Sequence, residues 1–157
     1  MRRKNTESGF SLVELLIVVA IIGIISAIAV PNLLASRRAA NEGSAIQSMR
    51  VFSSAQGTYF ATDGAGTYAT VTQLYNAGLV DEALYRASTG VLKNGYAFNT
   101  NPRAIGSSTA AGYISGASPA STIQGTRQFT SDESGVIYVQ DGTGAVPTTV
   151  GGVPVGN

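Results

Sequence analysis

The sequence predicts an α+β protein in which one long N-terminal helix packs on a small antiparallel β-sheet head. Two observations carry this prediction. An apolar run in the first quarter of the chain passes into a segment whose apolar residues recur at helical spacing. Short strand-like runs then alternate with turn residues, and most of the 19 glycines lie at Gly57 or later. We therefore expect a helix with a membrane half and an amphipathic half, followed by a turn-rich sheet.

The predicted elements divide the chain into five segments. They are a leader over residues 1–9, a transmembrane or assembly helix over residues 10–36, the amphipathic half of the same helix over residues 37–62, a globular head of helical loop and β-sheet over residues 63–150, and a loose tail over residues 151–157.

The apolar run is long enough to cross a bilayer. No residue from Leu15 to Ser36 is charged, and these 22 residues extend about 33 Å as a helix, against a hydrocarbon core of about 30 Å. The run is apolar on all sides, as lipid requires. Three bases precede it, at Arg2, Arg3 and Lys4. The positive-inside rule therefore predicts a cytoplasmic N-terminus.

Two simpler interpretations fit less well. A secretory signal peptide has an apolar region of 7 to 15 residues followed by a small-residue cleavage site, and this run is longer and is followed by another helical pattern. A plain single-pass anchor is the better alternative, but Glu14 lies inside the apolar run, where a carboxylate costs several kcal/mol unless it is paired.

A partner for Glu14 arises if the chain is cut after Gly9. The cut creates a new amine on Phe10, one helical turn from Glu14 on the same face. In a packed assembly, the Phe10 amine of one copy could neutralise Glu14 of its neighbour.

The stretch from Gly9 to Glu14 reads GFSLVE, between a short basic leader and an apolar run that ends at Pro31. This pattern resembles the N-terminus of type IV pilins and of the related pseudopilins of type II secretion. The resemblance implies that prepilin peptidase, a membrane aspartic protease, cuts between Gly9 and Phe10 and N-methylates Phe10. It also implies that Glu14 sets the register of subunits in a filament, and that the head is pilin-like.

Gly23 and Pro31 are the predicted weak points of the helix. Proline removes one helical hydrogen bond and crowds the preceding turn, and glycine lowers helix stability. The span between them can kink or partly unwind. A harmless kink, common in membrane helices, is the competing interpretation.

Beyond Pro31 the helical pattern continues to about Thr62, where Asp63-Gly64 begins a turn. The predicted core-facing side chains are Ile46, Met49, Phe52, Tyr59 and Phe60, with Ser48, Arg50, Ser54 and Thr58 on the opposite face.

The head is predicted to open with a short helix within residues 70–85, capped by Thr72 and ended by Gly78, with Asp81-Glu82 opening a second turn. Strands are expected at residues 95–99 and 111–116 and in a hairpin of residues 126–130 and 136–140. The stretch 115–122 is expected to be an exposed loop.

The composition excludes most common kinds of catalytic site. The chain has no cysteine and no histidine, which excludes Ser-His-Asp triads and Cys- or His-ligated metals. We predict no catalytic residue, no cofactor and no metal. Asp132, Glu133 and Asp141 could suggest a calcium loop, but their spacing favours a solvated hairpin turn. A net charge of +1 gives no sign of nucleic-acid binding.

The predicted function is that of a structural subunit of a type IV pilus. Its expected partners are further copies of itself, prepilin peptidase, the assembly machinery of the inner membrane, and membrane lipid before assembly. We expect it in the inner membrane first and in a surface filament afterwards. A pseudopilin of type II secretion is the main alternative, with a periplasmic filament. A single-pass envelope enzyme or sensor is a third hypothesis.

Overall fold

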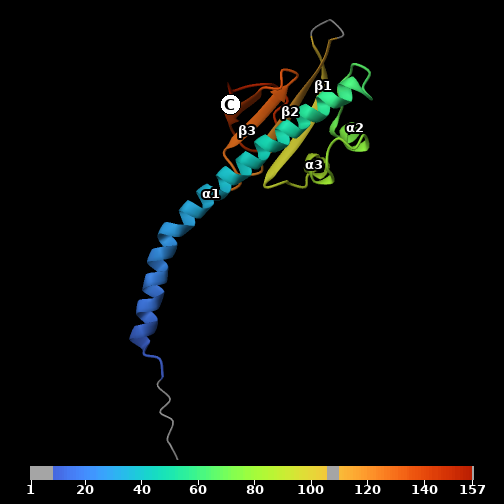
Figure 1. Cartoon of the computed structure of the whole chain (residues 1–157). Coiled ribbons are helices and arrows are strands. Elements are labelled where there is room, and N and C mark those ends of the chain that lie inside the picture. The colour runs from blue at the N-terminus through green and yellow to red at the C-terminus, as the bar shows by residue number, and fades with distance from the viewer. Residues whose placement is uncertain (1–8, 106–109, 157) are drawn as a thin grey trace, which may run out of the picture. The chain divides into compact units, whose positions relative to one another are not determined.

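A computed structural model describes residues 9–105 and 110–156. The chain forms two compact units that divide between Ser36 and Arg37, and the helix α1 (Leu12–Ala61) contributes to both (Figure 1). Within the second unit, α1 packs on a five-stranded antiparallel sheet. The predicted α+β class, with a long N-terminal helix on a small sheet, is confirmed.

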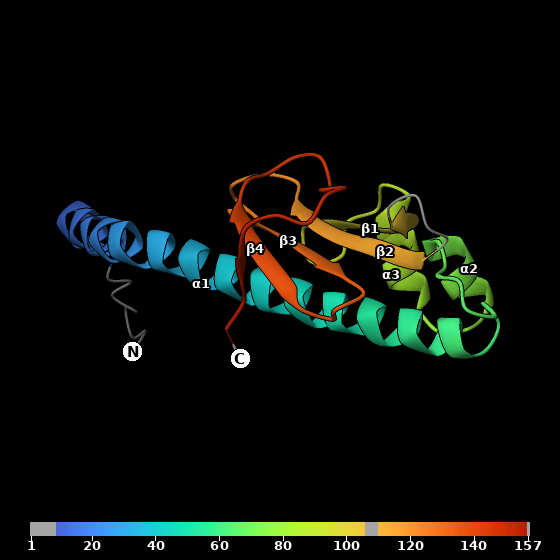
Figure 2. The same ribbon diagram turned by 90° about the horizontal axis from the view of Figure 1, so that it is seen from above.

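The second unit contains two short helices and one sheet. The helices are α2 (Val71–Asn76) and α3 (Glu82–Ser88). The strands are β1 (Tyr96–Ile105), β2 (Ala110–Pro119), β3 (Arg127–Asp132), β4 (Ile137–Asp141) and β5 (Val153–Pro154). They lie in the order β1-β2-β3-β4-β5, so each strand pairs with its neighbours in sequence. Figure 2 shows α1 along one face of this sheet, with α2 and α3 near β1.

The core lies between the second half of α1 and the inner face of the sheet. Met49 and Phe52 have no exposed surface, and the Phe52 ring lies 6.3 Å from that of Phe98. Ile46 and Tyr59 are partly buried against the same cluster. Phe60, which we predicted to fill the core, is instead 38% exposed and packs against Tyr68, with the tilted rings 4.8 Å apart between centroids. Phe60 is not among the side chains that pack on the core cluster, so its neighbour is Tyr68 and not the core.

The buried face of α1 is more polar than the spacing of apolar residues predicts. Ser48, which we placed on the opposite face, is 3% exposed, and Gln56 is completely buried. Gln56 accepts a hydrogen bond from the Ala69 amide at 2.9 Å and donates to Thr100 Oγ1 at 3.0 Å. Its amide therefore joins α1 both to the segment before α2 and to β1.

The first short helix begins two residues earlier than predicted. Its N-cap is Thr70 rather than Thr72, and Gln73 completes a capping box with the Thr70 backbone. Thr70 has an extended backbone, as an N-cap requires, whereas Thr72 lies within the helix. Asp81 caps α3 by accepting from the Leu84 amide at 2.7 Å, as the Asp81-Glu82 pattern indicates.

Two segments expected to be irregular are strands. The predicted exposed loop of residues 115–122 is wrong over its first half, because β2 continues to Pro119 and both Ser115 and Ser118 are completely buried. The tail that we expected to be loose contributes β5, which pairs with β4. In both places the small residues resemble a loop, and the strand forms by pairing with another part of the chain.

Candidate functional site

The predicted cleavage bond lies ahead of the first helical residue. Of the predicted leader, residues 1–8 lie outside the described residues, and Gly9 is exposed. Phe10 is 82% exposed, and α1 begins at Leu12. A Cβ atom placed on Gly9 would meet nothing within 4 Å. The Gly9–Phe10 bond is therefore accessible, and the surrounding fold does not require glycine at position 9.

Glu14 makes a contact that our sequence analysis missed. Its Oε2 atom accepts a hydrogen bond from the Ser11 amide at 2.9 Å, and Ser11 Oγ accepts from the Val13 amide at 3.3 Å. The carboxylate thus reaches back to the start of α1, as the glutamate of a capping box does. The signal was present in the sequence, since S-L-V-E over residues 11–14 matches the S-x-x-E pattern.

This contact gives Glu14 a role in the single chain. It satisfies one of the amides that a helix N-terminus leaves unpaired, and its charge lies at the positive end of the helix dipole. Glu14 and Phe10 are both exposed. Only Oε2 of the carboxylate takes part in this hydrogen bond.

The apolar half of α1 is exposed over its whole length. Every side chain from Leu12 to Ser36 is exposed in the single chain. In the described part of the chain, α1 is the one helix long and apolar enough to cross a membrane. Exposed apolar surface on this scale marks a segment that contacts lipid or other protein.

Gly23 and Pro31 both lie inside the continuous helix α1. A Cβ atom at Gly23 would meet nothing within 4 Å, so packing in the single chain does not require glycine there. Next to Pro31, the Asn32 side chain donates to the Ile28 carbonyl at 3.1 Å. The carbonyl that Pro31 leaves unpaired by lacking an amide hydrogen is that of Ala27, one residue earlier.

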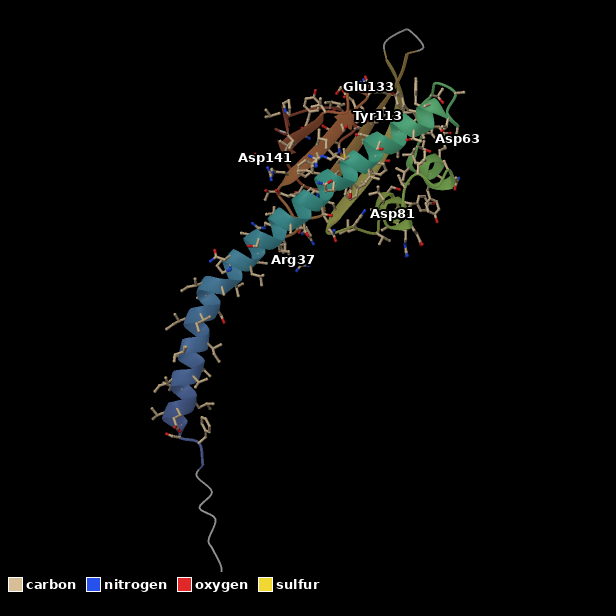
Figure 3. The ribbon with its side chains drawn as sticks, viewed as in Figure 1. Arg37, Asp63, Asp81, Tyr113, Glu133 and Asp141 are labelled. Atoms are coloured by element: carbon tan, nitrogen blue, oxygen red, sulfur yellow. The ribbon has the colours of Figure 1, made fainter. Side chains whose placement is uncertain are left out.

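The acidic residues of the head lie apart from one another. Figure 3 shows Asp63, Asp81, Glu133 and Asp141 at separate places around the second unit. Asp132 accepts from the Ser134 amide at 3.0 Å, and Glu133 pairs with Arg103 at 3.3 Å. Across residues 9–105 and 110–156, no group of three or more acidic, histidine or cysteine side chains is placed to hold a metal ion.

Comparisons with known proteins concern the N-terminal segment. The family described as the prokaryotic N-terminal methylation motif matches residues 4–30. A stretch of 38 residues is 62% identical to the type IV wide pilus major component PilA4 of Thermus thermophilus. That stretch covers 24% of this chain and 29% of the relative's length. No solved structure matches the chain.

Both matches concern proteins that carry a methylated N-terminus or build a pilus, and neither concerns an enzyme. The matched residues include Gly9, Phe10 and Glu14. The sequence therefore carries a prokaryotic N-terminal methylation motif, and this motif, the PilA4 match and the helix-on-sheet fold support the type IV pilin family, a family of structural subunits, for this chain.

Proposed function

We propose that this chain is the subunit of a type IV pilus, cut between Gly9 and Phe10, methylated on Phe10 and assembled through the first half of α1. The observation that carries the proposal is the pairing of an N-terminal methylation motif with a helix segment whose apolar side chains are all exposed. The match of 62% identity to a pilus component supports the same assignment.

The first half of α1 requires a partner from outside the chain. Burial of a large aliphatic side chain contributes roughly 1.5 to 3 kcal/mol, and this segment carries more than a dozen exposed side chains of that kind. In the proposed cycle, membrane lipid covers them before assembly and neighbouring helices cover them afterwards. The lipid-held subunit lies in the inner membrane with its N-terminus in the cytoplasm, where prepilin peptidase acts.

Glu14 is proposed to change partner during assembly. In the single chain it accepts from the Ser11 amide. Once the chain is cut, the positive amine of Phe10 from a neighbouring copy offers a stronger, charge-assisted hydrogen bond. A carboxylate that becomes surrounded by apolar helices needs such a partner. The exchange would fix how far one subunit lies along the filament relative to the next.

A pseudopilin of type II secretion would share the motif and the helix. The methylation motif belongs to both kinds of filament, so it does not separate them. The match to a wide pilus component favours the pilus. Examination of surface-sheared and periplasmic fractions with an antibody against the head would separate the two, because only a pilus extends beyond the cell surface.

The proposal is tested by the intact mass of the chain recovered from sheared surface filaments. We expect a mass that lacks residues 1–9 and carries one extra methyl group. In the Glu14→Ala variant we expect the cut and methylated chain to stay in the membrane and the filaments to be lost. Full-length chain found only in the membrane would refute the proposal.

Ser11→Ala is the matched control for Glu14→Ala. It removes the hydroxyl that accepts from the Val13 amide at the same helix start and leaves the carboxylate in place. If Glu14 acts through a neighbouring amine, Ser11→Ala keeps its filaments. If Glu14 acts only by capping its own helix, both variants lose filaments to a similar extent, and the exchange of partners has to be given up.

A further inference from the structure

We call residues 142–156 the C-terminal segment, and its middle part, residues 145–151, lies on the face of the sheet opposite α1. Gly116 and Gln128 point to this face, because they alternate with Ala117 and Phe129 of the core. A Cβ atom at Gly116 would lie 2.6 Å from the Pro147 carbonyl oxygen and 2.7 Å from the Val146 side chain. The segment therefore lies directly on β2.

Polar side chains on this face hold the segment in place. Gln128 Nε2 donates to Ser118 Oγ at 2.9 Å and to the Ala145 carbonyl at 3.0 Å. Gln140 Nε2 donates in turn to Gln128 Oε1 at 3.1 Å. Ser118 and Thr130 point away from α1 and yet have no exposed surface. The segment thus covers this face and is held to it by hydrogen bonds, in a chain that has no cysteine to hold it by a disulfide.

The end of the segment closes one edge of the sheet. In β5, Pro154 pairs with Tyr138 and Val153 pairs with Val139, while the Val155 amide donates to the Ile137 carbonyl at 2.7 Å. Antiparallel pairs alternate between bonded and non-bonded, so Pro154 occupies a non-bonded position whose amide would face outward. Proline has no amide hydrogen, and β5 therefore presents no donor to a further strand at this position.

Gly152 is what allows β5 to come this close. Its φ is +97°, and a Cβ atom there would lie 2.1 Å from the Val139 carbonyl oxygen. A side chain at position 152 would meet the backbone of β4, which cannot move without disturbing the sheet. Gly156, further along the same segment, has open space around it.

The strand next to β5, which is β4, is suited to pairing with a copy of itself. β4 reads IYVQD, and its first three residues are β-branched or aromatic, the types that favour strands. An uncovered edge of this kind pairs readily with another copy of itself. The opposite edge differs, because α2 and α3 pack against β1.

We propose that the C-terminal segment protects the edge of the sheet. By pairing with β4 through β5, it keeps β4 from pairing with β4 of a second copy of this chain. The inference goes beyond the proposed function, since it concerns the head alone and holds for the unassembled chain. In a filament the heads lie at high local concentration. An unpaired β4 edge there would let neighbouring heads pair with each other through β4.

The test uses the uncut full-length chain in detergent, with Gly152→Ala to release β5 and Gly156→Ala as the matched control. Amide hydrogen exchange of Val155 reports whether β5 is seated. Light scattering reports the mass of the protein in the micelle. A Val139→Cys reporter, placed in each background, is the one cysteine of the chain, so a disulfide between copies shows that they meet at β4.

We expect Gly152→Ala to lose the protection of the Val155 amide, to double the protein mass per particle and, with the reporter, to form disulfide-linked dimers. Gly156→Ala should behave like the parent chain in all three measurements. The proposal is overturned if the Val155 amide loses protection while the particle mass stays that of the control. It is overturned equally if the Val155 amide stays protected, since Gly152 would then not seat the strand. Neither result depends on filament assembly.

Discussion

The two halves of α1 have the same backbone conformation and opposite surroundings. In the first unit, Ile22 is 57% exposed and Leu33 is 69% exposed, and no side chain between Gly9 and Arg37 is buried. In the second unit, Met49 and Phe52 have no exposed surface at all. The more apolar half of the helix is therefore the exposed one.

The difference shows that burial in this chain follows the available partner rather than the polarity of the segment. The second half of α1 buries Glu42, Ser48 and Gln56, because the sheet and loops of the head offer each of them polar groups or close packing. Glu42 accepts from Arg127 Nε at 2.8 Å and from the Thr126 amide at 3.1 Å. The first half of the helix, exposed throughout, makes no comparable contacts between Leu12 and Ser36.

The largest expected effect comes from shortening one large apolar side chain in each half. Phe52→Ala leaves a cavity in the core and should lower the free energy of unfolding of the head by about 3 to 5 kcal/mol. Ile22→Ala removes an exposed side chain and should leave that free energy unchanged. Urea unfolding of the full-length chain in detergent, followed by tyrosine fluorescence, measures both.

A change in the exposed half of α1 should lower the filament yield without lowering the stability of the head. Ile22→Ala should reduce the amount of sheared filament although its head is as stable as that of the parent chain. Equal filament yields for Ile22→Ala and the parent would show that the exposed half of α1 is not an assembly surface at this position.

The next largest effect concerns the buried amide of α1. Gln56→Ala leaves the Ala69 amide and carbonyl, both buried, without their partner, which costs about 1 to 3 kcal/mol. The control is Gln47→Ala, a change of the same kind at an exposed position of the same helix. Urea unfolding of the two variants measures the difference, and we expect the lower midpoint for Gln56→Ala. Equal midpoints would mean that solvent replaces the Gln56 contacts.

The fold class and the long helix could be predicted because both rest on local signals. The apolar run, the amphipathic stripe and the turn residues each act over one or two helical turns or one hairpin. The burial of Ser115, Ser118 and Gln128 could not be predicted, because it depends on contacts between segments distant in sequence. A run of small polar residues has the same composition whether a loop or a second layer of chain covers it.

The candidate site likewise has features that the local sequence predicts and features that depend on contacts with other molecules. Spacing alone identifies Glu14 as an acid one turn from Phe10, and its contact with the Ser11 amide is readable from the S-x-x-E pattern. The role of Glu14 among several copies stays a prediction, since it depends on contacts between chains. The same holds for Gly23 and Pro31, whose effect depends on whether lipid or a neighbouring helix surrounds them.

A smaller effect is the loss of folding stability at alkaline pH through ionisation of tyrosine. It belongs to the head alone, because all seven tyrosines follow Gly57. Burial, and then the charge of Glu42, raises the pKa of Tyr96, and burial raises the pKa of Tyr113. The folded head therefore keeps protons that the unfolded chain loses above pH about 10. Stability is complete below that pH and should fall above it, by at most about 1.4 kcal/mol per pH unit for each such tyrosine.

Tyr96→Phe isolates this contribution. It removes the titrating group together with the hydrogen bond that Tyr96 donates to the Arg127 carbonyl at 3.0 Å. Its stability at neutral pH should be lower than that of the parent, and its decline above pH about 10 should be shallower. Parallel declines of the two proteins would show that Tyr96 ionises equally easily in the folded and unfolded chain.

The smallest expected effect compares two helix starts that side chains cap, one in each unit. Thr70 and Gln73 close the start of α2, and Ser11 and Glu14 close the start of α1. Thr70→Ala should lower the free energy of unfolding of the head by about 1 kcal/mol, since α2 carries the buried Leu74. Ser11→Ala should leave it unchanged, because Ser11 is exposed and belongs to the other unit. A loss of head stability in Ser11→Ala would mean that the two halves of α1 are coupled, and that the exposed half contributes to the folding of the head as well as to assembly.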